Sequence, residues 1–474
     1  MNHEGRSRKR IAIVGGGITG LSAAFELEQR RRQGAALDYV LYERAARLGG
    51  VILTERVEGC LIEAGPDAFL TEKPWAAELC RELGLGDQLM SSNDSERRTY
   101  IVVRNRLVPI PDGLQFMVPT RVGPVLASPL FSLSSKLRMA REWLMQPRRS
   151  EGDESAAAFV TRHFGEEIVE RLADQLLAGV YGGMAERLSA RAVLPRFVEM
   201  EEKHGSLARA MVAVRRKVGT TNPPRPLFTS LKDGMQQMVE AIAAKLDRAA
   251  VRLGVRVGSV ARHGDKWRVA AENGGEEFEA VILAVPAYAA GALLTAAYPK
   301  MAEVLERISY SSSVTVAFGY DAALPLLAGF GFLVPRREGR RMLACTFVHN
   351  KFPHRAPAGW LLLRVFLGGQ GDQRAHELND DEIKAIVRDE LRQILGLEAE
   401  PRFVRIYRWP RSMAQYEVGH LERVAEITRL RRELPGLFLA GNAYGGIGVP
   451  DCVREGREAA REALVIPSEG EGTR

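Results

Sequence analysis

A glycine-rich turn near the start of the chain holds the first residues whose types and spacing could do chemistry. The turn consists of Gly15, Gly16, Gly17, Ile18, Thr19 and Gly20, and it follows the apolar run Ile11–Val14. A pyrophosphate needs free backbone N–H groups and close backbone approach. The first glycine permits a tight turn, the middle one lets the backbone approach the phosphates, and the last lets a helix pack closely on the strand. The sequence therefore predicts a dinucleotide-phosphate site at this turn.

A carboxylate and a second glycine pair extend this signal. Glu43 ends the next strand-like run about 20 residues after the last glycine, where a carboxylate can accept hydrogen bonds from a ribose diol. Arg44 follows it, and Gly49 and Gly50 could again approach a phosphate closely. The stretch from Arg47 to Gly50 resembles the extended signature of the flavin amine oxidase superfamily and its GDP-dissociation-inhibitor relatives. This resemblance favours FAD over NAD, which would use the same first unit.

A second glycine-rich loop lies near the other end of the chain. It runs from Gly441 to Pro450 after a strand-like run, and helical spacing continues from Asp451 to Leu464. The N-terminus of that helix would face the flavin and would stabilise negative charge on the reduced ring system. The two ends of the chain are therefore expected to meet at one cofactor.

The elements that must position these residues follow an α/β pattern. From Ile11 the order is strand, glycine turn, amphipathic helix and strand (Tyr39–Tyr42), a βαβ unit of roughly 30 residues. Val251–Val260 is predicted to form a strand, and Phe278–Pro286 is typical of a buried parallel strand. Helical spacing dominates from about Ser135 to Val218, and strand-like runs between Tyr310 and Arg408 suit a second sheet that closes over a ligand. We expect an α/β fold with a discontinuous Rossmann-like FAD-binding domain (1–95, 222–300 and 425–474), a sheet-containing substrate-binding domain (96–135 and 301–424) and a helical subdomain (136–221).

The composition is that of an ordinary folded chain and excludes several classes of partner. Its 474 residues exceed what one hydrophobic core usually serves, so more than one domain is expected. The net charge of +7 allows an acidic substrate or an anionic lipid surface, but no aromatic-interleaved basic patch accompanies it, so no nucleic-acid partner is expected. Four scattered cysteines without a CxxC pair predict no metal site and no disulfide framework, and they fit a reducing, cytoplasmic compartment.

Further stretches narrow the resemblance to one family. The segment Gly65–Leu70, the loop from Gly441 to Cys452, Gly329–Pro335 and Arg408-Trp409-Pro410 together resemble the protoporphyrinogen/coproporphyrinogen oxidase family, and the resemblance covers nearly the whole chain. It implies an oxygen-dependent FAD oxidase that removes six electrons and six hydrogens from a porphyrinogen and reduces O2 to hydrogen peroxide. Flavin N5 would accept hydride from a meso C–H while the protein positions the macrocycle and excludes water. No catalytic side chain is then required, and no triad-like arrangement is evident.

The resemblance also implies which residues contact the cofactor. Val257 would reach the adenosine side through its backbone at the end of a strand, unless it is a core valine, and Trp409 would cover the edge of the flavin ring, unless it only packs. The full set of expected FAD contacts is Gly15, Gly16, Gly17, Ile18, Thr19, Gly20, Glu43, Arg44, Gly49, Gly50, Gly65, Pro66, Asp67, Ala68, Val257, Trp409, Ile447, Gly448 and Val449.

The expected substrate contacts are Lys73, Thr99, Gly182 and Gly331. Protoporphyrinogen-type members of the family place an arginine where this chain has Thr99, and Lys73 resembles a basic residue of the coproporphyrinogen-type members. A carboxylate-rich substrate needs such cationic groups. We therefore expect oxidation of coproporphyrinogen III to coproporphyrin III in haem biosynthesis, with protoporphyrinogen IX as the alternative substrate.

Other interpretations stay open at this point. The chain could be another flavin enzyme of the superfamily, acting on amines or polyenes, or a non-catalytic binder like the GDP-dissociation inhibitors. His420 and Tyr416 could lie beneath the substrate, close a hydrogen-bond network beneath the flavin, or serve the core alone. Basic amphipathic stretches from Lys136 to Arg149 suggest peripheral contact with the inner face of the cell membrane. Whether the chain forms a homodimer is also open.

Overall fold

Five parallel strands from three distant parts of the chain form one sheet of this computed structural model, which describes residues 8–149, 152–218, 226–272, 274–321 and 328–465. The strands, in spatial order, are β12 (Val251–Leu253), β2 (Leu37–Glu43), β1 (Lys9–Val14), β16 (Ala280–Leu283) and β22 (Leu437–Leu439). In the centre, Ile11 lies opposite both Tyr39 and Ala280. All three are almost completely buried, as the near-continuous apolar runs of parallel strands require.

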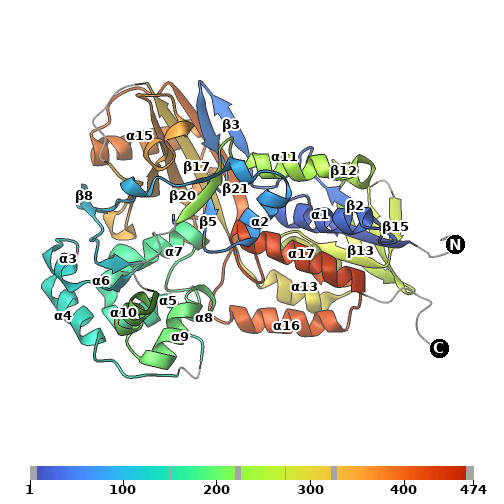
Figure 1. Ribbon diagram of the computed structural model, residues 1–474, viewed down its shortest axis with the longest axis horizontal. Coiled ribbons are helices and arrows are strands. Elements are labelled where there is room, and N and C mark those ends of the chain that lie inside the picture. Colours follow the sequence, from blue (N-terminus) through green and yellow to red (C-terminus); the bar gives the residue numbers. More distant parts are fainter. Residues whose placement is uncertain (1–7, 150–151, 219–225, 273, 322–327, 466–474) are drawn as a thin grey trace.

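Two long helices lie side by side on this sheet (Figure 1): α1 (Ile18–Arg32) and α17 (Val449–Val465). Gly456 permits their close approach, because a Cβ atom there would lie 2.1 Å from the carbonyl oxygen of Thr19. The buried carboxylate of Glu26 on α1 pairs with Arg457 at 2.8 Å and Arg461 at 2.9 Å on α17. The two glycine-rich loops immediately precede these two helices, so the fold brings both loops to the same edge of the sheet.

A small antiparallel sheet was not expected from the sequence. It consists of β13 (Val257–His263), β14 (Lys266–Ala271) and β15 (Gly274–Phe278). A single strand from Val251 to Val260 was predicted, and this prediction is wrong: Gly254 has a φ of +69° and separates β12 from β13. A left-handed backbone cannot continue a strand, so the chain leaves the parallel sheet at this glycine.

A second, seven-stranded sheet has the order β21-β17-β20-β19-β18-β7-β8. Its strands are β7 (Thr99–Val103), β8 (Arg106–Pro109), β17 (Tyr310–Tyr320), β18 (Gly331–Leu333), β19 (Met342–Phe347), β20 (Leu361–Gly368) and β21 (Phe403–Ala414). Helix α15 (Asp380–Leu395) covers part of it and begins with a capping box made by Asn379 and Glu382. The strand-like runs predicted between Tyr310 and Arg408 thus join into one sheet.

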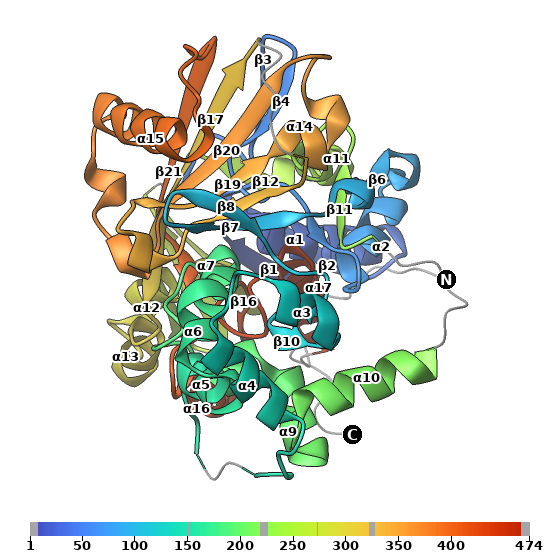
Figure 2. The ribbon, with the colours of Figure 1, turned by 90° about the vertical axis from the view of Figure 1, so that its left-hand side faces the viewer.

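Helices α3 to α10 gather below this sheet (Figure 2). They are α3 (Val122–Ala127), α4 (Leu133–Glu142), α5 (Ala156–Phe164), α6 (Glu166–Ile168), a π-helical turn (Val169–Ala173), α7 (Asp174–Tyr181), α8 (Ala190–Val193), α9 (Pro195–His204) and α10 (Leu207–Val218). Buried polar groups organise this block. His163 lies between two buried carboxylates, with Nδ1 3.2 Å from Glu142 and Nε2 3.2 Å from Glu201.

His163 makes the stability of the helical block depend on pH. Burial alone would lower the pKa of His163, but its hydrogen bonds to Glu142 and Glu201 outweigh burial and raise that pKa above its usual 6.5. A group whose pKa is higher in the folded state stabilises that state fully below its unfolded pKa, and the stabilisation disappears as pH rises through the folded pKa. We therefore expect the unfolding free energy of the block to fall as pH rises above about 6.5. Denaturation monitored against pH tests this, and a His163→Gln control that falls equally would contradict it.

The remaining elements are short or connect the two sheets. They are β3 (Thr54–Val57), β4 (Cys60–Glu63), β5 (Phe69–Leu70), α2 (Trp75–Glu82), β6 (Leu89–Ser91), β9 (Leu114–Gln115), β10 (Val118–Pro119), β11 (Phe228–Leu231), α11 (Gln236–Lys245), α12 (Ala287–Leu294), α13 (Pro299–Glu306), α14 (Val348–Lys351) and α16 (His420–Arg432). Within the described residues, no helix is long and apolar enough to cross a membrane. The mixed α/β architecture is confirmed. The domain boundaries stay predictions, and the one between 221 and 222 lies outside the described residues.

Candidate functional site

The glycine turn forms a cradle at the carboxyl end of β1. Gly15 has a φ of +109°, and a Cβ atom there would lie 2.4 Å from the carbonyl oxygen of Ala284. A Cβ atom on Gly20 would lie 1.9 Å from the carbonyl oxygen of Gly15, so only glycine fits where α1 packs on the turn. Gly17, in contrast, faces open space, with no heavy atom within 4 Å of a Cβ atom built there.

The start of α1 is suited to an anion. Gly17 is the N-cap residue, and no side chain caps the helix. The N–H groups of the first turn therefore have no capping oxygen, and the positive end of the helix dipole points toward the open side of Gly17. A pyrophosphate fits this arrangement, because it needs both the space and the donors.

The second glycine pair and Glu43 lie against the turn. Glu43 Oε2 accepts a hydrogen bond from Gly16 N at 2.6 Å. Gly49 N donates to Gly16 O at 2.8 Å, and a Cβ atom on Gly50 would lie 3.3 Å from the Cα atom of Gly17. A carboxylate oxygen can accept more than one hydrogen bond, so Glu43 can hold the turn and still bind a ribose hydroxyl.

Two of the other expected FAD contacts, Arg44 and Val257, come after the neighbouring strands β2 and β12 of the parallel sheet. Arg44 is exposed and directly follows β2. Val257 is buried and begins β13, whereas the sequence predicted that it ends a strand. The chain reaches it from Val255, whose N–H donates to Glu43 O at 2.9 Å. Val257 thus belongs to the core while its strand starts beside Glu43.

The segment Gly65–Ala68 lies where the two sheets approach. Trp409 on β21 donates its indole N–H to Ala64 O at 2.8 Å, and Arg364 on β20 donates to Gly65 O. A Cβ atom on Gly65 would lie 1.9 Å from Val51 O. The structure therefore joins Trp409 to this segment through a hydrogen bond, which the sequence did not predict.

The C-terminal loop reaches the site from the other side. Gly448 N donates to Asp451 Oδ2 at 3.1 Å in the first turn of α17. Lys73 Nζ lies 2.9 Å and 2.7 Å from the two oxygens of this buried carboxylate. Lys73, expected at the substrate, is thus held by Asp451, whose role the sequence did not assign. Together they fix the loop that holds Ile447 and Val449.

Tyr416 and His420 form a brace beneath this loop. The Tyr416 hydroxyl donates to Asn442 O at 2.9 Å and accepts from Gly446 N at 3.0 Å. The His420 ring stacks on the Tyr416 ring, with a centroid separation of 4.0 Å and an interplanar angle of 13°. Burial, with a smaller effect of Arg423, lowers the pKa of His420 to about 4, so this ring is neutral at pH 7.

The structure does not bring all the expected substrate residues together. Thr99 and Gly331 are direct neighbours across β7 and β18. Gly182 ends α7 with a φ of +61°, and a Cβ atom there would lie 2.8 Å from Ser311 Oγ on β17. Three strand steps separate β17 from β18, roughly 14 Å. These residues can therefore contact one ligand only if that ligand is broad.

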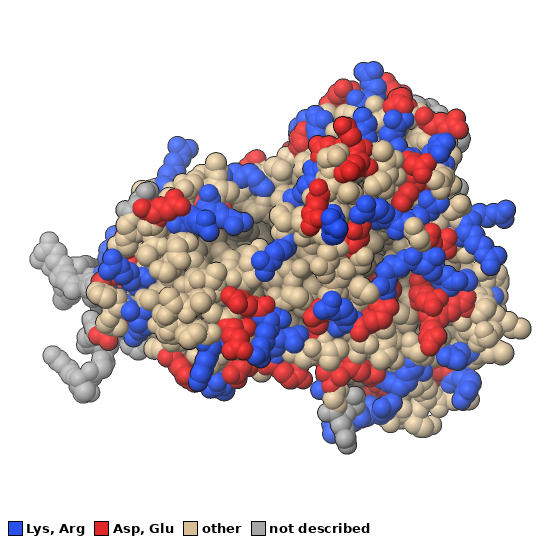
Figure 3. Space-filling model, turned by 180° about the vertical axis from the view of Figure 1, so that it is seen from behind, with Lys and Arg blue, Asp and Glu red and all other residues tan. Residues whose placement is uncertain are grey.

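Two surface features lie outside this site. On the face shown in Figure 3, basic and acidic side chains are interspersed, so the net charge of +7 does not gather into one basic patch there.

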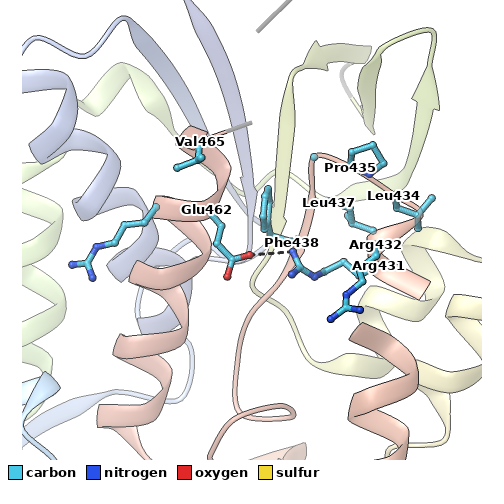
Figure 4. Close-up of a pocket in the computed structure, with 10 residues that line it drawn as sticks. Arg431, Arg432, Leu434, Pro435, Leu437, Phe438, Glu462 and Val465 are labelled. Atoms are coloured by element: carbon cyan, nitrogen blue, oxygen red, sulfur yellow. Dashed lines mark ion pairs between the residues drawn. The ribbon is translucent and has the colours of Figure 1, made fainter. Parts of the chain in front are cut away.

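A surface cavity of about 560 Å³ is lined by Arg431, Phe438, Glu462 and their neighbours (Figure 4). It lies at the amino end of β22, whereas ligands of open α/β sheets bind at the carboxyl ends of the strands. We assign it no role in the chemistry.

Comparison with known proteins identifies the family. The model of the flavin-containing amine oxidoreductases matches residues 18–464. The chain belongs to this family. The predictions of a flavin cofactor and of an oxidoreductase are thereby confirmed.

Individual relatives cover nearly the whole chain. The coproporphyrinogen III oxidase of Bacillus subtilis (strain 168) is 34% identical over 465 residues, which is 96% of this chain and 98% of that protein. Protoporphyrinogen oxidase 2 of Arabidopsis thaliana is 27% identical over 494 residues, covering 96% of this chain and 94% of that protein. The crystal structure of a putative protoporphyrinogen oxidase from Exiguobacterium sp. 255-15 superposes with a TM-score of 0.87 and 32% identity, covering 97% of this chain and all of that one. A putrescine oxidase, at 19% identity and a TM-score of 0.67, shares the fold.

Proposed function

We propose that this protein is an FAD-dependent coproporphyrinogen III oxidase of haem biosynthesis. It would remove six electrons and six hydrogens from coproporphyrinogen III and transfer them to three O2 molecules, giving coproporphyrin III and three H2O2. The observation that carries the proposal is the full-length similarity to coproporphyrinogen III oxidases, at 34% identity, against 27% for the plant protoporphyrinogen oxidase. Protoporphyrinogen-type members of the family have an arginine at the position of Thr99, and its absence from this chain also favours coproporphyrinogen III as the substrate.

The cofactor would extend from the glycine cradle to the C-terminal loop. The open side of Gly17 and the uncapped start of α1 suit its pyrophosphate, and Glu43 suits its ribose. Gly65–Ala68 and Ile447–Val449 would contact the ring system, and bound FAD would supply the hydride acceptor. Trp409 would act by holding Ala64 O, which fixes the position of this segment.

The residues of the chain would position the substrate without acting as a general base. His420 is buried and its lowered pKa makes it a weak base, and the Tyr416 hydroxyl already makes two hydrogen bonds to the loop. The hydrogens on the porphyrinogen nitrogens would then leave by proton loss and tautomerisation. The protein would orient the macrocycle and exclude water.

Lys73 would contact a propionate of the substrate while it remains paired with Asp451. An ammonium group has three donors, and Asp451 takes two of them. The Lys73 side chain is 36% exposed and that of Asp451 only 3%, so the remaining donor can face a ligand. Thr99 and Gly331 would line the opposite part of the same broad ligand.

Anaerobic reduction of the bound flavin by each porphyrinogen in turn tests the proposal. We expect coproporphyrinogen III to bleach the flavin absorbance faster than protoporphyrinogen IX at equal concentration. Faster reduction by protoporphyrinogen IX would reverse the substrate assignment. Reduction by amines or polyenes alone would favour another branch of the superfamily, and a colourless purified protein would favour a non-catalytic binder.

We propose that the protein contacts the inner face of the cell membrane through helices α3 and α4. Large apolar side chains are exposed there, with Leu133 72% and Leu137 62% exposed one turn apart on α4. Arg138 and Arg141 on the same helix supply positive charge. An apolar stripe beside basic residues is typical of a surface that binds anionic lipid. In Figure 1 these helices lie at the end of the molecule opposite to the parallel sheet.

Replacing both leucines is expected to release the protein from lipid. The Leu133→Ser/Leu137→Ser variant should lose most flotation with anionic liposomes, because each buried leucine contributes about 1.5–3 kcal/mol. Leu253→Ser, which changes an exposed leucine on β12, serves as the control. Failure of the wild-type protein to float, or equal flotation of all three proteins, would contradict the proposed contact.

A further inference from the structure

Five charged side chains form a cluster that includes one residue of the segment Gly65–Ala68, and we call it the buried charge cluster. The acidic members are Glu63 and Asp67, and the basic members are Lys351, Arg355 and Arg364. Every side chain in the cluster is at most 18% exposed. Three cations therefore face two carboxylates in the interior.

Each carboxylate of the cluster is held by at least one ion pair. Lys351 Nζ lies 2.8 Å from Asp67 Oδ2, and Arg364 Nη1 lies 3.6 Å from Asp67 Oδ1. Burial alone would raise the pKa of Asp67, but the three cations outweigh burial and hold it well below its usual range. Glu63 pairs with Arg355 at 3.3 Å and also accepts hydrogen bonds from Met235 N and Thr54 Oγ1.

Two of the cations also hold the backbone of Gly65–Ala68. Arg364 donates to Gly65 O. Arg355 Nη2 donates to Asp67 O at 3.2 Å, and Ser230 Oγ donates to the same oxygen at 2.7 Å. The cluster is therefore coupled mechanically to the segment that we place at the flavin.

One positive charge of the cluster is left over. In the described part of the chain, the three cations make no ion pair within 4.0 Å except those with Glu63 and Asp67. Arg355 Nε and Arg364 Nε are buried without a hydrogen-bond partner, and both residues line a small cavity of about 10 Å³, which holds one water at most. Aromatic rings face these cations, with Lys351 Nζ 4.5 Å from the centroid of the Phe228 ring and Arg355 4.3 Å from that of Phe352, so cation–π contacts support the surplus charge without neutralising it.

We propose that this surplus charge complements the negative charge that FAD gains on reduction and so raises the reduction potential of the bound cofactor. A hydride brings two electrons and one proton, so its transfer from the porphyrinogen carbon to the neutral flavin ring system adds one negative charge. A fixed positive charge in a water-excluded site stabilises that product more than the oxidised form. Arg355 and Arg364 are positioning residues, because they hold the Gly65–Ala68 backbone against the ring. The inference rests on the proposed placement of that segment.

Flavin potentials of charge-altered variants, measured in the FAD-loaded protein without porphyrinogen, test this inference. Lys351→Gln removes one positive charge and is expected to lower the ratio of reduced to oxidised flavin at fixed ambient potential about tenfold, which is about 30 mV for a two-electron couple. Asp67→Asn should raise the ratio by a similar factor. The double variant Lys351→Gln/Asp67→Asn restores the surplus of one and should return close to the wild-type value.

Two further variants separate net charge from other effects. Arg364→Lys keeps the charge and loses the forked guanidinium, so it should shift the potential less than Arg364→Gln. Arg336→Gln removes an arginine that pairs with Asp174 and Glu186 in a different region, and it should leave the potential unchanged.

The outcomes distinguish this inference from the proposed function. Unchanged potentials in both Lys351→Gln and Asp67→Asn would overturn the inference and leave the substrate assignment untouched. If Lys351→Gln does not fold, the direction of the Asp67→Asn shift decides alone: a raised potential supports the inference, and an unchanged or lowered one overturns it. Loss of porphyrinogen turnover with wild-type potential would count against the proposed function instead.

Discussion

Gly17→Asp is expected to abolish FAD binding while the fold remains intact. The new side chain would enter the open side of the cradle, where nothing lies within 4 Å of a Cβ atom. Aspartate is a preferred N-cap residue, and Gly17 already has the extended backbone of an N-cap, so α1 should be stabilised slightly. The carboxylate would, however, face the pyrophosphate. At a separation of about 4 Å and an effective dielectric constant near 20, that repulsion is about 4 kcal/mol, or about a thousandfold in affinity.

Flavin absorbance of the purified variant, followed by titration of the apoprotein with FAD, measures this loss. Gly123→Ala, at an uncrowded glycine of α3, is the matched control and should bind FAD normally. Gly20→Ala is expected to differ from both, because its Cβ atom would meet Gly15 O at 1.9 Å and disturb the fold itself. Normal FAD content in Gly17→Asp would show that the pyrophosphate lies elsewhere.

Glu142→Ala is expected to unfold the helical block. Glu142 is 1% exposed and accepts hydrogen bonds from His163, from Ser206 Oγ at 2.8 Å and from the first backbone N–H groups of α10. It therefore caps α10 and holds a buried histidine at once. Removing one partner of a buried charged network leaves the others unpaired, which costs about 3–5 kcal/mol.

Denaturation followed by tryptophan fluorescence, together with limited proteolysis between residues 133 and 218, measures this effect. Glu199→Ala removes a glutamate of the same block whose side chain is 66% exposed, and the change in stability there should stay within about 0.5 kcal/mol. Equal stability of the two variants would mean that the buried network contributes little. A selective loss of the helical block, with FAD retained, would show that it unfolds separately from the cofactor site.

Sequence reasoning failed where a single local break or a distant contact decides the structure. Apolar residues alternate along the predicted strand from Val251 to Val257, but the left-handed Gly254 divides this run, and the antiparallel sheet begins after it. The pairing of Lys73 with Asp451, 378 positions along the chain, was not predicted, and the role of Lys73 at the substrate stays a prediction. Arg364 stands inside an apolar strand-like run, and that unusual charge was the signal that could have identified it.

The sequence by itself determined the part of the site that consists of contiguous backbone. The glycines from Gly15 to Gly20 and the distance to Glu43 suffice to predict a dinucleotide cradle, because a turn and the start of a helix recognise phosphate through neighbouring N–H groups. Only the tertiary structure decided what surrounds the Gly65–Ala68 segment. Lys351, 284 positions from Asp67, and Trp409, 345 positions from Ala64, meet it because helix α14 and strand β21 of the second sheet carry them there. Such contacts depend on how the strands are ordered in space, and local residue patterns do not encode that order.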